Sequence, residues 1–159
     1  MPTPFVAVPA GPASAPGTVV TAGDFYPDID CNRIRDELRL GDVVTHDRLV
    51  GAVRGALVTV LRELADWTAQ AILDGHASLA AVRPVPEIDG EAAIVHAFRR
   101  AVQFHAAAEL AELHRDVSTT AEGSSRADTQ MLTAAEYRRM ATHAVRDIQA
   151  QTRTDVELI

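Results

Sequence analysis

The stretch THDRLVGAVRGALVTVLRELADWTAQAILD, residues 45–74, decides the fold class. Its apolar residues recur in steps of three and four, which is the period of an α-helix with one buried face. Thr45 is a typical N-cap residue and Gly75 a typical stop, so we expect a single helix here, about 40 Å long. Gly51 and Gly55, four residues apart, indicate a close approach by another helix or by a partner backbone.

Further helices are expected on both sides of this stretch. Asp30 is placed to cap a short helix that Gly41 ends, and Asp89 is placed to cap a third helix. A loop rich in serine, threonine and glycine then precedes the last helix. The expected helices cover residues 31–40, 45–74, about 90–114 and about 126–151. The sequence therefore predicts an all-α fold, a small helical bundle of three long helices plus a short one.

Both ends of the chain are predicted to be extended. Residues 1–24 hold five of the eight prolines, which fix φ and remove backbone donors, so we interpret them as a Pro/Ala-rich arm. Its run Thr18–Thr21 is a candidate strand for pairing with something outside the domain. The helical domain is expected over residues 25–153. In the tail, residues 154–159, apolar and acidic residues alternate with the period of a strand.

The composition weighs against several classes of protein. The 159 residues carry 22 acidic groups and 15 basic ones, all arginine, for a net charge of −7. A protein that binds DNA through its phosphates needs a basic face, and so does a polybasic membrane anchor. The arm lacks a positive n-region and is interrupted by prolines, so we read it as neither a signal peptide nor a membrane span. The single cysteine, Cys31, excludes an intramolecular disulfide.

The sequence offers few candidates for chemistry. His105, Glu109 and Glu112 fall on one helix face, but the zinc-protease and di-iron spacings are absent, so we favour a partly buried histidine beside solvated carboxylates. Cys31 stands near a helix start, which can lower a thiol pKa, although an incidental cysteine is the simpler interpretation. The doublets Arg99-Arg100 and Arg138-Arg139 are expected to be solvated and paired with nearby glutamates. No catalytic residue, metal site or cofactor is predicted.

The chain resembles the gpL-type head completion/stabilisation proteins of contractile-tailed temperate phages. The resemblance runs from about Phe25 to Ile159 and rests on rare strings in the same order and spacing. They are FYPDID at 25–30, Arg33 and Arg35, Arg39-Leu40, Arg48-Leu49, EIDGE at 87–91, RAV at 100–102, the stretch 108–116 with Ser118, Ala127-Asp128, and AVRDIQ at 144–149.

The resemblance implies a structural adaptor at the head–tail interface, or neck, of a virion, assembled in the host cytoplasm. Such subunits are expected to form a ring of about twelve copies beneath the portal protein after DNA packaging. The ring completes and stabilises the DNA-filled head and offers a surface to a downstream stopper or neck protein. Packaged DNA passes through its lumen without sequence-specific binding, and no membrane is involved.

The two extended ends supply the candidate contact residues. We expect the tail to dock on the portal by strand addition or by filling an apolar groove. Its portal-binding residues are Thr154, Val156, Leu158 and Ile159. The candidate residues for contact with a neighbouring subunit or neck protein are Phe5, Val6, Val19, Val20, Phe25 and Tyr26.

Two other classes stay open at the level of sequence. The first is a small helical metal-binding or enzymatic bundle that uses His105, Glu109 and Glu112. The second is a nucleic-acid-binding regulator, which would need the basic face that this composition does not supply.

Overall fold

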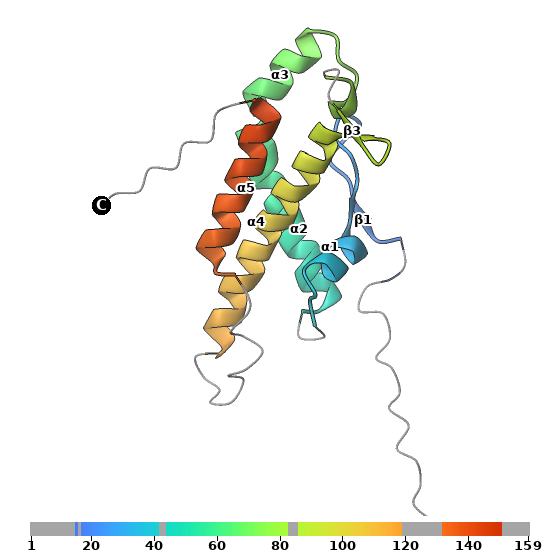
Figure 1. Cartoon of the computed structure of the whole chain (residues 1–159). Helices are drawn as coiled ribbons and strands as arrows, with labels where there is room; N and C mark the ends of the chain where they lie inside the picture. The colour runs from blue at the N-terminus through green and yellow to red at the C-terminus, as the bar shows by residue number, and fades with distance from the viewer. Residues whose placement is uncertain (1–14, 16, 42–43, 83–85, 119–131, 151–159) are drawn as a thin grey trace, which may run out of the picture.

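The fold is built from helices, with two very short sheets beside them (Figure 1). The computed structural model describes residues 15, 17–41, 44–82, 86–118 and 132–150. Within these residues the helices are α1 (Cys31–Glu37), α2 (His46–Glu63), α3 (Ala65–Leu73), the 3-10 turn η1 (Leu79–Ala81), α4 (Ala93–Ser118) and α5 (Ala134–Gln149). The strands are β1 (Val19–Val20), β2 (Ile29–Asp30), β3 (Glu87–Ile88) and β4 (Glu91–Ala92). The predicted predominance of helix is confirmed, although the predicted all-α class lacks these two sheets.

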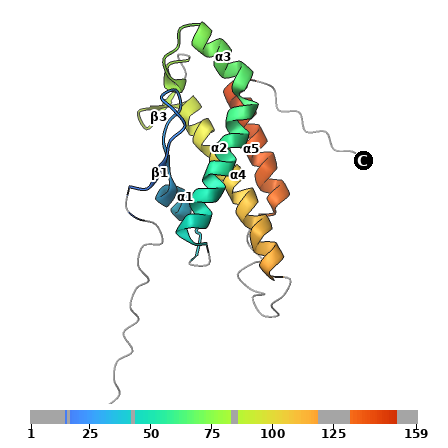
Figure 2. The same cartoon turned by 180° about the vertical axis from the view of Figure 1, so that it is seen from behind.

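Helix α4 lies at the centre of the bundle and packs against both α5 and α2. Figures 1 and 2 show the three helices side by side from opposite directions, with α1 and the β1–β2 ribbon beside α4. Phe98 and Val102 of α4, Val53 of α2 and Ile148 of α5 are completely buried where these helices meet. Burying such side chains stabilises the fold by about 1.5–3 kcal/mol each.

The single helix expected over residues 45–74 is wrong. The helix is interrupted at Leu64, where α2 ends and α3 begins at an angle (Figure 1). Leu64 is completely buried, and its carbonyl still accepts a hydrogen bond from Thr68 N at 2.7 Å. The bend thus keeps Leu64 in the core and redirects α3 over Tyr26, a contact that no local sequence pattern indicates.

Of the two glycines in α2, only Gly55 meets another helix. A Cβ at Gly55 would lie 2.7 Å from Oε2 of Glu109 on α4, whereas a Cβ at Gly51 would meet nothing within 4 Å. A neighbouring helix therefore approaches Gly55, as expected, whereas no described residue comes close to Gly51. Contact of Gly51 with a partner backbone stays a prediction.

The strand-forming run near residue 20 pairs within the same chain. Val19 lies opposite Asp30 and Val20 opposite Ile29 in an antiparallel ribbon. Val20 and Ala22 pack against the hydrophobic core, so residues from Gly17 onward lie against the helical domain. The partner that this run was expected to need is supplied by the chain itself.

The EIDGE segment forms a hairpin and does not cap a helix. Strands β3 and β4 pair through a turn at Asp89 and Gly90, with φ values of 54° and 77°. An Asp-Gly pair is the residue choice that such a two-residue turn favours, because both central residues need positive φ. The predicted capping role of Asp89 is therefore wrong, and α4 begins at Ala93 and continues to Ser118.

The remaining helix starts are set by side-chain caps. The carboxylate of Asp30 accepts hydrogen bonds from the backbone of Asn32 and Arg33, and the Thr45 hydroxyl accepts one from Arg48, as predicted. Thr133 and Glu136 form a capping box at the start of α5, a signal that the sequence interpretation missed. The expected residues 126–131 and 151 of this helix lie outside the described part of the chain.

Candidate functional site

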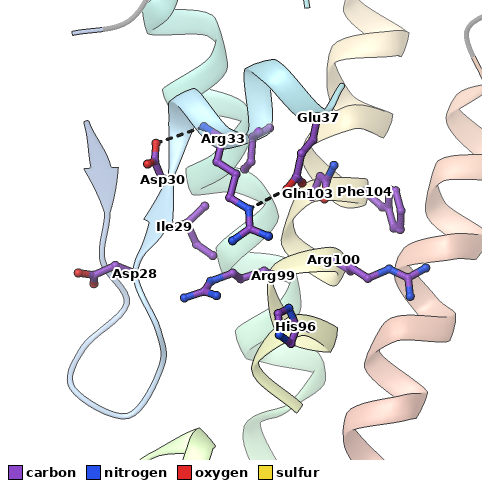
Figure 3. Close-up of a pocket in the computed structure, with 11 residues that line it drawn as sticks. Asp28, Ile29, Asp30, Arg33, Glu37, His96, Arg99, Arg100, Gln103 and Phe104 are labelled. Carbon is purple, nitrogen blue, oxygen red and sulfur yellow. Dashed lines mark hydrogen bonds and ion pairs between the residues drawn. The ribbon is translucent and has the colours of Figure 1, made fainter. Parts of the chain in front are cut away.

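A hollow lies between the β2–α1 segment and α4 (Figure 3). It has a volume of about 550 Å³, and its apolar lining comes from Ile29, Ile34 and Phe104. Arg33 enters it from α1, while Arg99 and Arg100 enter it from α4. Figure 3 shows Arg99 directed towards the β1–β2 ribbon and Arg100 directed towards α5. The fold thus brings together arginines that are more than sixty positions apart in the sequence.

Two of the three arginines are paired with carboxylates. Arg33 Nε donates to Glu37 Oε1 at 2.7 Å, one helical turn away, and Arg99 forms an ion pair with Glu91 of β4. Arg100 is exposed, and its guanidinium carbon lies 5.6 Å from the centroid of the Phe104 ring. Among the residues that the structure describes, Arg100 has no carboxylate within ion-pair distance. It remains available to an anion from elsewhere.

A second, smaller hollow of about 290 Å³ adjoins the first and shares His96 and Arg100 with it. Its other walls are mainly apolar and come from the β3 region and the start of α4. Asp147, near the end of α5, completes it. The lining residues are Pro86, Ile88, Ala93, Ile94, His96, Ala97, Arg100 and Asp147. We call the two hollows together the α4 groove.

A separate depression surrounds the residues of the metal-site alternative. His105 Nε2 is buried without a hydrogen-bond partner among the described residues and lies 3.8 Å from Glu63 Oε1. Burial lowers the pKa of His105, with Glu63 opposing the shift, and burial also raises the pKa of Glu109. Glu112 is turned towards Arg138, 2.6 Å away.

The metal-binding alternative does not come together in this depression. Across the described ranges, no three His, Cys, Asp or Glu side chains are arranged to hold a metal ion. The arrangement instead places an imidazole with a lowered pKa and a carboxyl with a raised pKa at a helix–helix junction.

Cys31 is not a reactive thiol. Its side chain is completely buried at the start of α1, and burial together with the nearby Asp30 raises its pKa. A thiolate nucleophile needs the opposite shift and access to a substrate. Cys31 therefore acts as a small apolar residue of the core.

The candidate contact residues fall into two groups. Phe5, Val6, Thr154, Val156, Leu158 and Ile159 lie outside the described residues. Val19 is 47% exposed on β1, whereas Phe25 and Tyr26 pack on the core. The Tyr26 ring stacks on Phe98 with centroids 4.8 Å apart, and its hydroxyl lies 2.5 Å from that of Thr68. Both aromatic residues have a role inside the subunit.

Sequence reasoning missed the exposed apolar side chains of α3. This helix projects beyond the ends of α4 and α5 in both views (Figures 1 and 2). Ile72 is 55% exposed and Leu73 is 80% exposed. Helical periodicity predicts a buried face that includes Ile72, and Leu73 falls outside that periodicity.

Comparison with known proteins assigns the family. The family model of the phage head completion protein (GPL) matches residues 20–159, which include every helix described above. The chain belongs to this family. The head completion/stabilization protein of Escherichia phage P2 is 37% identical over 159 residues, covering 93% of this chain and 94% of the relative.

Membership in this family places the chain in phage head assembly. No solved structure matches the chain significantly. Within its described residues, none of the helices has the length and apolar character needed to cross a bilayer.

Proposed function

We propose that the chain is the connector subunit that joins the DNA-filled head of a tailed phage to its tail. In this proposal it forms a ring beneath the portal protein, closes the head and presents a surface to the next neck protein. The observation that carries the proposal is the family match, which spans residues 20–159 and thus the helical domain as a whole. The relative from phage P2 is named for head completion and stabilization, the step at which such a ring would act.

Helix α3 supplies a suitable surface for contact between neighbouring subunits. A single subunit exposes Ile72 and Leu73 on a helix that projects from the bundle, and such side chains are typical of protein interfaces. Covering two of them with a neighbour contributes about 1.5–3 kcal/mol each. A contact of this size is weak in a pair of subunits and becomes effective when a ring closes on a shared platform.

The chain ends are proposed to make the remaining contacts. The tail, residues 154–159, docks on the portal through Val156, Leu158 and Ile159. The arm reaches a neighbouring subunit or a neck protein through Phe5 and Val6, and the exposed Val19 of β1 adds to this contact. The net charge of −7 supports passage of DNA through the ring, because an acidic surface repels phosphates and avoids holding them.

Light scattering on the purified protein, alone and mixed with the portal of its phage, tests the proposal. The expected result is a small species alone and a portal-sized complex in the mixture. Absence of association at every salt concentration would contradict the connector role. Deleting residues 154–159 is expected to weaken portal binding. Deleting residues 1–14 keeps the β1–β2 ribbon and therefore tests the proposed contact of the arm with a neighbouring subunit or neck protein.

A matched pair of substitutions tests the α3 surface. Leu73→Asp is expected to prevent ring closure on the portal while the subunit stays folded, because the side chain is exposed. Leu113→Asp, at a residue that is 43% exposed on α4, is the control. Equal ring formation by both variants would exclude α3 from the subunit contact.

A further inference from the structure

A stripe of exposed residues runs along the outer side of α2. Figure 2 shows this helix on the near side of the bundle, in front of α4. Successive residues of a helix turn by about 100°, so one side of α2, within about 80° of its circumference, carries every fourth or third residue from Asp47 onward. These residues are Asp47, Gly51, Arg54, Val58 and Arg62, and all five are exposed. We call them the α2 stripe.

The α2 stripe combines an apolar side chain with charges that have no partner in the subunit. Val58 is 64% exposed and lies between the two arginines. In the part of the chain that the structure describes, Asp47, Arg54 and Arg62 have no ion-pair partner. An exposed apolar side chain among unpaired charges of both signs suits a contact with another protein surface.

The α2 stripe is complementary in shape to a second copy of itself. A Cβ at Gly51 would meet nothing within 4 Å, so open space lies over the backbone there. Val58 follows two helical turns later on the same side. In an antiparallel pair of α2 helices centred between residues 54 and 55, Val58 of each copy faces Gly51 of the other. The valine then fills the space over the glycine, as a knob enters a hole in paired helices.

The same register is complementary in charge. It sets Asp47 opposite Arg62 of the second copy, and the two-fold symmetry repeats this pair at the other end of the contact. Arg54 comes opposite Gly55, where the carboxylate of Glu109 lies against the glycine backbone. A parallel pair of helices would instead set each charge opposite its own copy, which is unfavourable. The charges therefore favour the antiparallel pair.

The remaining charges of the contact follow the same order. Arg48 comes after Asp47 and Glu63 comes after Arg62, so the reversed direction of the second helix sets Arg48 near Glu63. Within its own chain Glu63 also lies 3.8 Å from His105. The arginines at position 54 of the two copies approach each other at the two-fold axis, and the carboxylates of Glu109 beside them offset this repulsion.

We propose that two copies of the free protein pair antiparallel through the α2 stripe. The contact joins identical faces, so it closes as a dimer and cannot continue around a ring. A contact between one pair of helices is smaller than the roughly 1,600 Å² of a standard interface, so the dimer dissociates on dilution. It forms before the protein meets a portal, and the proposal does not depend on the connector role.

Reversing one charge at each end of the α2 stripe tests the register. Sedimentation equilibrium of the full chain, without a portal, is expected to show a monomer–dimer equilibrium. Asp47→Arg and Arg62→Asp should each raise the dissociation constant about tenfold, because symmetry doubles the effect of every lost pair. An equal mixture of the two variants should dimerise again, since both contacts then join opposite charges. A monomer at every concentration of the unchanged protein, or no recovery in the mixture, would overturn the proposal.

Arg139→Asp is the matched control, because Arg139 is exposed on α5 and lies outside the α2 stripe. It should leave the dissociation constant unchanged, and an equal weakening by this variant would overturn the assignment to α2. Circular dichroism and thermal melting confirm that each variant is folded.

Cysteine cross-linking tests the same register without reversing a charge. Gly51→Cys and Val58→Cys are mixed under oxidising conditions, and the expected disulfide joins the two variants. Each variant alone should cross-link slowly, because identical positions lie about 10 Å apart along the pair. The natural Cys31 is completely buried and does not compete. Equal yields in the mixture and in the separate variants would overturn the register. Because no portal is present, failure here leaves the light-scattering test of the connector role unaffected.

Discussion

Replacing Tyr26 by phenylalanine tests how α3 is held against the bundle. The Tyr26 ring stacks on Phe98, and its hydroxyl lies 2.5 Å from that of Thr68, which is 9% exposed on α3. Phenylalanine keeps the ring and the stacking but removes the hydroxyl. The Thr68 hydroxyl then loses the partner that this structure gives it.

The expected cost follows from the burial of the pair. A hydrogen bond between neutral side chains contributes about 0.5–1.5 kcal/mol, and an unpaired buried hydroxyl costs about 1–3 kcal/mol. Since the pair is only partly buried, we expect a loss of about 1–2 kcal/mol in the free energy of unfolding. For a domain of this size such a loss lowers Tm by roughly 3–6 °C.

Urea unfolding and thermal melting of Tyr26→Phe give the magnitude. Tyr137→Phe is the matched control, because Tyr137 is also buried and stacks on Phe104, but its hydroxyl has no hydrogen-bond partner in the described part of the chain. Adding Thr68→Val to Tyr26→Phe should restore part of the stability by removing the unpaired hydroxyl. If both tyrosine variants lose the same small amount, the hydroxyl pair does not anchor α3.

Three further predictions concern stability. Gly51→Ala should stabilise the fold by about 0.5–1 kcal/mol, since the added Cβ meets open space. Gly55→Ala should stabilise it less, because the side chain of Glu109 must shift. Comparing the Tm values of the two variants tests this difference. Thr133→Ala should cost about 1 kcal/mol by removing the cap of α5, and Thr133→Ser should retain most of the stability in the same urea titration. Burial lowers the pKa of His105 in the folded state. The contribution of His105 to the stability of the fold is therefore present above the unfolded-state pKa of about 6.5, and it is lost as the pH falls through the folded-state pKa. His105→Gln should therefore flatten the loss of stability as the pH falls below about 6.5, and an unchanged slope would contradict that assignment.

The parts of the fold that could be predicted from sequence are those set by neighbouring residues. Asp30 and Thr45 cap their helices because a cap needs only a side-chain oxygen two or three residues before the backbone amides it accepts from. Gly75 follows the end of α3 with φ of 90°, a conformation that favours glycine. In each case a local signal was sufficient.

The errors have two physical origins. The bend at Leu64 is stabilised by distant contacts, since Tyr26 reaches Thr68 across 42 positions, and helical periodicity alone continues through it. The hairpin at Asp89-Gly90 is different, because its signal was local and was read as a helix cap. Aspartate is favoured both as a helix cap and in a two-residue turn, and the glycine after Asp89 favours the turn.

The arginine doublets show why the groove could not be foreseen. The prediction of pairing with nearby glutamates is confirmed for Arg99 with Glu91 and for Arg138 with Glu112. Successive residues on a helix point about 100° apart, so the two arginines of a doublet cannot share one partner direction. While Arg99 turns to β4, Arg100 is directed towards α5 and the groove (Figure 3). The partner of each arginine in a doublet is therefore set by the tertiary arrangement of the helices, which the local sequence does not give.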